Sequence, residues 1–424
     1  FYAKNEKDMK VLWVSNIIFP EACNDLRMTP PVVGGWMHAG AIALLESNSH
    51  LDLAVASLYP GTELKIITNH KIQYYLIPQI KGNQYYNKEW EQFFKQIEEH
   101  FKPDIIHIHG SEYPYSLACA KTCNTKNMVV SIQGMVSVYA QYYLGGIPIK
   151  EIHKARTFRD IIRKDSLPIQ QHKMYRRGEY ERQLLRIVKH VIGRTRWDRS
   201  NVWAVSPNVT YHFCNETLRP TFYHKKWEYH TCQKHTIFLS QAHYPIKGLQ
   251  QVIKALPIIL QHYPDTQVYV AGNNFISTSL LRKNGFANYI QRLIRTYHVE
   301  HTIHFLGILS EEEMAEQYTQ AHVFVCPSAI ENSPNSVGEA QLIGTPCIAS
   351  YTGGTMDMIT DNETGFLYRY EETALLAQRV CELFENSELC EKLMKNEREI
   401  AMLRHNREIN AQNLNNIYQS ILKQ

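Results

Sequence analysis

The chain has 424 residues, a formal net charge of +4, and a composition that is 44% hydrophobic and 20% charged. These proportions are ordinary for a folded globular protein and argue against a disordered or collagen-like chain. No run of about 18 apolar residues occurs, so the sequence predicts no membrane-spanning helix. At roughly 150 residues per domain, the length predicts two or three domains.

The first half of the chain alternates short β-type runs with helical stretches, which is typical of parallel α/β architecture. We expect strands at 10–14, 51–57, 72–78, 104–109, 128–132, 190–193 and 202–205. We expect helices between Met37 and Leu45, at 89–101 and at 115–121. The segment 140–190 is predicted to be helical and basic, with breaks at Pro148 and Pro168.

A second α/β series follows a predicted linker at 207–235, which lacks clean periodicity. Its expected strands lie at 236–239, 266–271, 302–306, 322–326, 346–350 and 365–368. Its expected helices lie at 248–262, 287–298 and 335–343, with three more before the end of the chain. Two such units in series predict a deep cleft between their strand ends, where ligands of parallel sheets bind. No GxGxxG follows a predicted strand and no GxxxxGK[ST] occurs, which argues against a dinucleotide-binding dehydrogenase and a P-loop protein.

The cysteines and the start of the chain bear on location. Nine cysteines without a CxxC pair predict mostly buried thiols in a reducing compartment. The chain opens without the charged stretch and apolar run of a secretory signal, so we expect a cytoplasmic protein. A zinc site built from His212, Cys214, His230 and Cys232 is an alternative, although their spacing matches no common zinc pattern.

Positive charge is concentrated between residues 150 and 199, which include 15 Lys and Arg residues but only 6 Asp and Glu residues. Such a band in a nearly neutral protein predicts an anionic partner, which would be phosphate, a nucleotide or a membrane surface. No DNA- or RNA-binding motif accompanies the band, so we do not expect nucleic acid. The alternative is that the basic residues lie on a pair of solvent-exposed helices and bind no anionic partner.

The most informative segment follows the predicted strand 322–326. Glu331 lies in a loop, and Glu339 lies eight residues later, near the first turns of the next helix. Ser333 is expected to cap that helix and Pro334 to be its first residue. The helix would offer backbone amides to a phosphate, and the two glutamates would accept hydrogen bonds from hydroxyl groups. The alternative is a capped helix whose acidic residues only favour the helix dipole.

This E-x7-E segment resembles the motif of glycosyltransferase family 4, whose members are retaining nucleotide-sugar transferases with the GT-B fold. Other stretches are also similar to that family: LSQAHYPIKGLQQVIKAL, IGTPCIAS, TGGTMDMITDNETGFLY, KVLWVSN and PDIIHIHG. The resemblance implies two Rossmann-like parallel-sheet domains that face a central cleft. We place the acceptor domain with its linker at 1–230, the donor-nucleotide domain at 231–405, and a terminal helix that crosses back to the first domain at 406–424.

The resemblance also implies roles for individual residues. Glu339 would bind the ribose and Glu331 the donor sugar, while Lys247 would neutralise the diphosphate. The other donor-binding residues would be Asn335, Ser336, Gly353 and Gly354, together with Gly34 and Gly35, which would let the first loop approach the diphosphate. No metal ion and no other cofactor would be required, because lysine and helix amides would stabilise the leaving group.

Two positions depart from the family pattern. Ala242 stands where the family usually has arginine, and Arg194 is our candidate for the replacement cation. Gln133 stands where the family often has histidine, and an amide cannot act as a general base. This favours a front-face route driven by the leaving group. His109, at the end of its predicted strand, is a further catalytic candidate.

We therefore expect a retaining transferase that moves a sugar from a nucleoside-diphosphate sugar to a glycan or lipid-linked acceptor in polysaccharide biosynthesis. A peripheral contact with an anionic membrane through 150–199 would fit this role. The alternatives are a sugar phosphorylase or a nucleotide-sugar epimerase on the same fold, or a non-catalytic scaffold that binds nucleotide-sugars.

Overall fold

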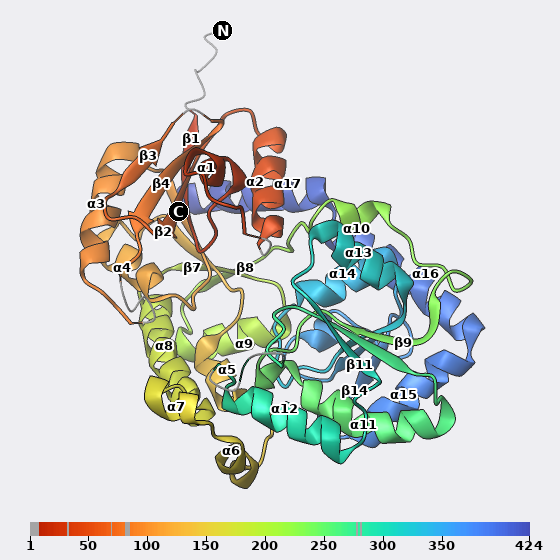
Figure 1. Cartoon of the computed structure of the whole chain (residues 1–424). Helices are drawn as coiled ribbons and strands as arrows, with labels where there is room; N and C mark the ends of the chain where they lie inside the picture. The colour runs from red at the N-terminus through yellow and green to blue at the C-terminus, as the bar shows by residue number, and fades with distance from the viewer. Residues whose placement is uncertain (1–7, 32–33, 69, 81–84, 277–278, 280–281) are drawn as a thin grey trace. The chain divides into compact units, whose positions relative to one another are not determined.

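The computed structural model describes residues 8–31, 34–68, 70–80, 85–276, 279 and 282–424. The chain divides into two compact units, shown with their elements in Figure 1. Unit 1 comprises residues 1–138, 173–218 and 406–424, and unit 2 comprises residues 139–172 and 219–405. Among the described helices, none is both long and apolar enough to cross a bilayer.

Unit 1 contains an eight-stranded sheet in the order β3-β4-β2-β1-β5-β6-β7-β8, parallel except for the β3–β4 pair. Its strands are β1 (Met9–Ser15), β2 (Leu51–Tyr59), β3 (Lys65–Ile67), β4 (Ile72–Pro78), β5 (Ile105–His109), β6 (Met128–Ser131), β7 (His190–Gly193) and β8 (Thr210–Phe213). Its helices are α1 (Pro20–Asp25), α2 (Gly35–Ser47), α3 (Glu89–Phe101), α4 (Pro114–Thr122), α9 (Arg196–Val205) and α17 (Arg407–Leu422). Helices α5 (Val136–Tyr142) and α8 (Leu167–Ile187) contain residues of both units.

Each face of the unit 1 sheet buries a separate apolar cluster. On one face, Trp90 and Phe94 of α3 pack with Leu117 of α4 and with the strands. On the other face, Ile417 and Tyr418 of the terminal helix α17 pack with α2 and with β1 and β2. The terminal helix is therefore part of the unit 1 core.

Unit 2 contains a six-stranded parallel sheet in the order β11-β10-β9-β12-β13-β14, the doubly wound order of a Rossmann-type domain. Its strands are β9 (Gln233–Leu239), β10 (Gln267–Ala271), β11 (Ile303–Gly307), β12 (Ala321–Cys326), β13 (Cys347–Ser350) and β14 (Phe366–Tyr368). Its helices are α6 (Ile149–Ala155), α7 (Phe158–Arg163), α10 (Thr221–His224), α11 (Leu249–His262), α12 (Gly285–Thr296), α13 (Glu311–Gln320), α14 (Asn335–Ile343), α15 (Thr373–Glu385) and α16 (Ser387–Arg404). Two 3-10 turns are η1 (Pro245–Lys247) and η2 (Thr355–Asp357).

The predicted strands are confirmed to within a few residues, with one exception. The strand predicted at 202–205 is wrong, because these residues form the last turn of α9. The capping box of Thr195 and Asp198 starts that helix, and Val202 is the residue of the turn that it buries. Strands β3 and β8 were not predicted, because their side chains are largely exposed or half-buried.

The boundaries of the units differ from the expected domain limits in two places. The division falls after Leu218, and the expected linker at 207–235 contains β8, α10 and the start of β9. Residues 139–172, expected in the N-terminal domain, group with unit 2. One reason is that the Asn288 side chain on α12 donates to the carbonyl of Ala155 at 2.9 Å.

Candidate functional site

The order of the unit 2 strands sets the position of the site. Strands β9 and β12 are neighbours although β10 and β11 separate them in sequence, so the strand order reverses between them. Parallel α/β sheets bind ligands outside the strand ends at such a point. Strand β9 leads to η1, and the wholly buried β12 leads to the loop 327–334. The amide of Ala329 in this loop donates to the carbonyl of Ile246 in η1 at 2.7 Å, which joins the two segments.

Lys247 and Glu331 form an ion pair at this point. Lys247 Nζ lies 2.5 Å from Glu331 Oε1, and the Ser328 hydroxyl donates to the same oxygen at 2.8 Å. Burial lowers the pKa of Lys247, but Glu331 and Tyr244 outweigh that effect and hold the pKa above its ordinary value. The ammonium group is therefore charged at neutral pH and fixed in position, as an anionic ligand would require.

Glycines allow the loops around this pair to approach one another. Gly248 has φ of +74°, and a Cβ at this position would lie 1.7 Å from the Pro327 carbonyl oxygen. Gly353 has φ of +55°, and a Cβ there would lie 1.9 Å from the carbonyl oxygen of Glu331. The amide of Gly354 donates to that same oxygen at 2.9 Å. The predicted donor residues Gly353 and Gly354 therefore hold the backbone of Glu331.

The start of α14 also differs from expectation in one detail. Pro334 is the cap residue rather than the first helical residue, and no side chain caps the helix. Ser333, expected as the cap, directs its hydroxyl to Met358 Sδ at 3.5 Å instead. Asn335 and Ser336 are the first residues of α14, so their amides lie at the end of the helix where anions bind.

Glu339 lies in the same helix and is paired with Arg219. The Nε and terminal nitrogen atoms of Arg219 donate to Glu339 Oε1 at 3.1 and 2.7 Å. The Tyr318 hydroxyl lies 3.4 Å from Oε2. Burial raises the pKa of Glu339 and Arg219 lowers it, with burial the larger effect. The carboxylate is thus held by one cation and one hydroxyl at the edge of the α14 terminus.

The remaining predicted residues lie in unit 1. Gly34 caps α2 with φ of +85°, and a Cβ there would lie 2.5 Å from the Ile17 side chain. Gly35 is the first residue of α2, and the two residues before Gly34 lie outside the described part of the chain. The predicted glycine loop is therefore described only from Gly34 onward.

Arg194 and Gln133 share one acidic partner in unit 1. Arg194 forms an ion pair with Glu216, and the Gln133 amide donates to Glu216 Oε1 at 2.8 Å. Arg194 also lies 3.4 Å from the Gln133 oxygen. Ala242, which Arg194 was expected to compensate, is buried in unit 2. The structure therefore pairs Arg194 inside its own unit.

His109 ends β5 and lines a small unit 1 cavity of about 60 Å³ together with Arg194 and Glu216. Its ring lies 3.8 Å from that of His107 and 4.2 Å from that of Trp13. Burial lowers the pKa of His109 to about 3, so the ring is neutral at physiological pH. Its Nε2 has no hydrogen-bond partner among the described residues.

The residues considered for zinc have other contacts. His212 Nε2 lies 3.2 Å from His190 Nδ1, and the Cys232 thiol donates to the Tyr229 carbonyl at 3.3 Å. Within the described part of the chain, no three His, Cys, Asp or Glu side chains are arranged to hold a metal ion. The zinc alternative therefore has no ligand set in these residues.

Three residues near the unit 2 pairs were not predicted. Arg219 lies in the expected linker, and nothing in its sequence context indicates Glu339, 120 positions away. Ser328 lies within the predicted motif, and its hydroxyl could have been noted there. Tyr139 is half-buried; its partial removal from water raises its pKa, and the charge of nearby Glu331 adds to that effect. Its place in the sequence, within α5, gives no sign of this proximity.

Part of the unit 2 sequence matches a known family. Residues 222–400 match the family described as glycosyl transferases group 1. The resemblance to glycosyltransferase family 4 is thereby confirmed, since the matched region contains Lys247, Glu331 and Glu339.

Curated relatives are similar over parts of the chain. A putative glycosyltransferase of Bacillus subtilis, YtcC, is 29% identical over 180 residues, which is 42% of this chain and 43% of the relative. A phosphatidyl-myo-inositol mannosyltransferase of Mycobacterium leprae is 26% identical over 189 residues, which is 44% of this chain and 47% of the relative. The chain thus spans less than half the length of these relatives.

Solved structures are similar over nearly the whole chain. A sucrose-phosphate synthase from Thermosynechococcus elongatus has a TM-score of 0.71 at 15% identity, covering 98% of this chain and 99% of that one. HepE of Anabaena, solved with UDP and glucose, has a TM-score of 0.64 at 16% identity, covering 97% and 100%. At these identities the likeness shows the fold. The expected GT-B fold, with two Rossmann-like parallel-sheet domains, is confirmed.

Proposed function

We propose that this protein is a retaining glycosyltransferase that moves a sugar from a nucleoside-diphosphate sugar to a glycan or lipid-linked acceptor. The observation that carries the proposal is the pair of buried cation–carboxylate contacts beside the start of α14. Lys247 meets Glu331, and Arg219 meets Glu339, at the strand-order reversal of the unit 2 sheet. The family match and the names of the curated relatives support this chemistry.

In the proposed reaction the leaving group is a nucleoside diphosphate. Lys247 and the amides of Asn335 and Ser336 would stabilise the negative charge that develops on it, which is the main catalytic task in such a transfer. Glu339 would accept hydrogen bonds from the ribose diol and Glu331 from the donor sugar. Gly34, Gly35, Gly353 and Gly354 would let backbone amides approach the donor.

The proposed route needs neither a metal ion nor a histidine base. Gln133 would hydrogen-bond an acceptor or sugar hydroxyl but cannot take its proton. His109 is neutral at physiological pH, because burial lowers its pKa to about 3, and its Nε2 could accept a hydrogen bond from such a hydroxyl. Departure of the diphosphate would therefore drive a front-face transfer, with Arg194 as a candidate second cation.

The acceptor and the location form part of the proposal. The Mycobacterium leprae relative is named a phosphatidyl-myo-inositol mannosyltransferase, which supports the lipid-linked form of the proposed acceptor. The nine free thiols support a reducing, cytoplasmic setting. We place the protein in polysaccharide biosynthesis, with a peripheral contact to an anionic membrane through the basic band at 150–199.

A turnover assay tests the proposed reaction. UDP- and GDP-sugars would be incubated with the protein and with lipid-linked or oligosaccharide acceptors, and release of the nucleoside diphosphate would be measured. Proton NMR of the product would give the anomeric configuration, and a retaining enzyme keeps that of the donor. We expect Glu331→Gln to lose turnover while it keeps nucleotide affinity.

The alternatives predict different products. A phosphorylase would need inorganic phosphate, and an epimerase would convert the nucleotide-sugar with no acceptor. A scaffold would bind nucleotide without turnover for any acceptor. Inversion of the anomeric centre, or turnover unchanged in Glu331→Gln, would contradict the proposed mechanism.

A further inference from the structure

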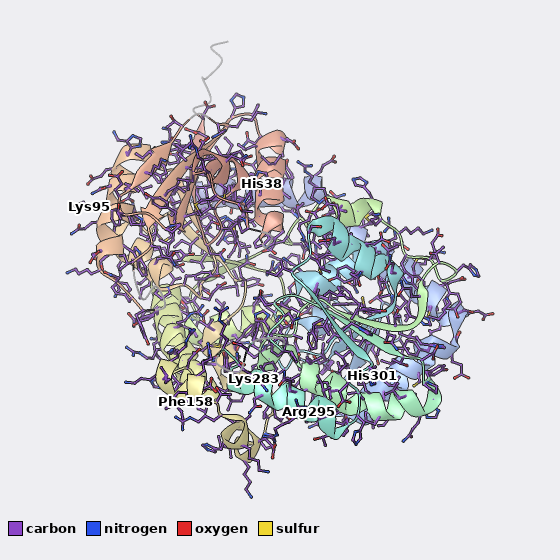
Figure 2. The ribbon with its side chains drawn as sticks, in the orientation of Figure 1. His38, Lys95, Phe158, Lys283, Arg295 and His301 are labelled. Atoms are coloured by element: carbon purple, nitrogen blue, oxygen red, sulfur yellow. The ribbon has the colours of Figure 1, made fainter. Side chains whose placement is uncertain are left out.

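Helices α6 and α7 expose large apolar side chains. Phe158 is 71% exposed, Ile162 64%, Ile149 53% and Ile161 52%. Phe158, Ile161 and Ile162 are spaced i, i+3, i+4, so they lie on one face of α7, which we call the α7 apolar face. Figure 2 labels Phe158 at the surface of the molecule. Single exposed apolar residues are ordinary, but a contiguous group of this kind marks an interaction surface.

The exposed charged side chains of the stretch 149–164, which contains this face, are all positive. The exposed cations between residues 149 and 164 are Lys150, Lys154, Arg156, Arg163 and Lys164. The two acidic residues of that stretch have internal roles. Glu151 pairs with Lys154 at 2.9 Å and with Arg292 on α12. Asp160 is buried and closes a capping box with Thr157.

The α7 apolar face belongs to an ordered helix that is fixed to unit 2. Asp160 packs close to Gly285 of α12, where an added Cβ would lie 2.8 Å from Asp160 Oδ2. Arg159 is 15% exposed and pairs with Asp160 at 3.4 Å and Asp165 at 3.3 Å. Arg159 and Asp160 of α7 are therefore turned inward, while Phe158, Ile161 and Ile162 are left in solvent. Folding alone gives no reason for that arrangement.

The other half of the basic band is arranged differently. In residues 173–199, Arg177 donates to the carbonyl of Glu112 at 2.9 and 3.1 Å. Arg182 pairs with Glu179 at 2.6 Å, and Arg194 pairs with Glu216. These cations serve contacts within unit 1. Tyr175, beside the exposed Arg176, is 41% exposed in this half, whereas four large apolar side chains of 149–164 are each more than half exposed.

This combination of exposed cations and exposed apolar side chains indicates which class of partner binds here. The core of a protein interface is depleted of charge, and lysine is depleted in interfaces generally. A nucleic acid would be bound by cations and stacking rings, with no use for Ile161 and Ile162. An anionic bilayer uses both features, since its phosphates attract Lys and Arg while its acyl boundary accepts aliphatic and aromatic side chains.

We propose that α7 inserts Phe158, Ile161 and Ile162 into the headgroup region of an anionic bilayer, with the five exposed cations of 149–164 on the lipid phosphates. This deepens the membrane contact of the proposed function and assigns it to one helix. It does not depend on the sugar transfer, because lipid binding is measured without donor or acceptor.

Vesicle flotation tests the proposal with the full chain. Vesicles of phosphatidylcholine with 30% phosphatidylglycerol would be compared with pure phosphatidylcholine at low and physiological salt. We expect binding to the anionic vesicles alone. Each Lys or Arg near such a surface raises the binding constant roughly fivefold, so Arg163→Glu/Lys164→Glu should weaken binding by at least about 25-fold. Phe158→Ser/Ile162→Ser should weaken it by at least about tenfold, because two inserted side chains are lost.

Matched controls distinguish binding through this surface from nonspecific effects of net charge and of exposed apolar side chains. Leu403→Ser removes a side chain that is 65% exposed on α16, and Lys95→Glu reverses an exposed cation on α3 (Figure 2). Both should float like the wild type. Absence of wild-type flotation, or equal losses in these controls, would overturn the proposal. Full binding by Phe158→Ser/Ile162→Ser would overturn insertion. Self-association abolished by that variant, without vesicle binding, would assign the face to a second copy of the chain.

Discussion

Two buried carboxylates of unit 2, Glu331 and Glu339, differ in their surroundings from two of unit 1, Glu181 and Glu112. In unit 2, Glu331 and Glu339 each face a cation from a distant part of the chain, at 2.5 Å from Lys247 and 2.7 Å from Arg219. In unit 1, Glu181 is buried and is held by neutral donors, which include the Ser111 hydroxyl and the Ser137 amide. Glu112 has a buried Oε2 with no hydrogen-bond partner among the described residues.

This difference separates two uses of a buried acid. A carboxylate beside a fixed cation is oriented and ready to accept hydrogen bonds from a ligand, which suits the proposed donor site. A carboxylate without that support holds its proton more tightly. Burial, with a smaller contribution from Glu181, raises the pKa of Glu112 to about 7 against the opposing effect of neighbouring donors and arginines. Glu331 and Glu339 are therefore held in a geometry suited to a ligand, while Glu112 makes stability depend on pH.

Breaking the Lys247–Glu331 pair should give the largest effect. Lys247→Ala leaves Glu331 buried without its cation, and removal of one partner from a buried pair costs about 3–5 kcal/mol of stability. Urea unfolding measures this loss. The double variant Lys247→Ala/Glu331→Ala leaves no unpaired charge, so it should recover part of the stability. A double variant less stable than the single one would contradict this account of the pair.

The second-largest expected effect is the pH dependence of stability that Glu112 of unit 1 causes. The folded pKa of Glu112, about 7, lies above its ordinary value, so its contribution to stability is full at low pH and is lost as pH rises through about 7. The wild type should lose about 2–3 kcal/mol from this group between pH 5 and pH 8. Glu112→Gln should lose that slope in unfolding experiments at the two pH values. Glu89→Gln, an exposed control on α3, should keep it.

Arg219→Gln should have a somewhat smaller effect, about 2 kcal/mol, because a hydrogen bond to a charged group is replaced by a weaker one. Loss of the arginine removes an influence that lowers the pKa of Glu339, so the pKa of this buried acid rises further. The cost should therefore be larger at pH 8 than at pH 5, where Glu339 takes up a proton. Lys226→Gln, at an exposed position of the same segment, provides the control. A cost that does not change with pH would argue against the ion pair.

The alternating pattern of the sequence predicted most strands and helices. It did not predict side-chain pairs formed between segments that are distant in the sequence. Strands with buried side chains, such as β12, can be predicted from their apolar runs. Strand β8 has exposed and half-buried residues, so it has no such run. The family resemblance placed Lys247 and Glu331 in one site, and the structure brings them together; their catalytic roles remain predictions. Arg219 could not be found, because its pairing with Glu339 exists only once α10 and α14 are packed.

The cap of α14 provides the smallest expected effect. Ser333 was predicted to cap this helix, but its hydroxyl contacts Met358 and Pro334 is the cap residue. Ser333→Ala should therefore change stability by less than about 0.5 kcal/mol. Ser310 closes a true capping box with Glu313 on α13, so Ser310→Ala should cost about 1 kcal/mol. Equal losses in thermal unfolding of the two variants would restore Ser333 as a cap.

The most direct test of the proposed donor site is calorimetric titration of UDP, GDP and ADP into the wild type, Glu339→Ala and the exposed control Glu363→Ala. We expect one nucleotide series to bind the wild type and the control equally. We expect Glu339→Ala to lose at least about tenfold in affinity, or about 1.4 kcal/mol. Binding by Glu339→Ala as tight as that of the wild type, or no binding of any nucleotide to the wild type, would contradict the assignment of these pairs to a donor site.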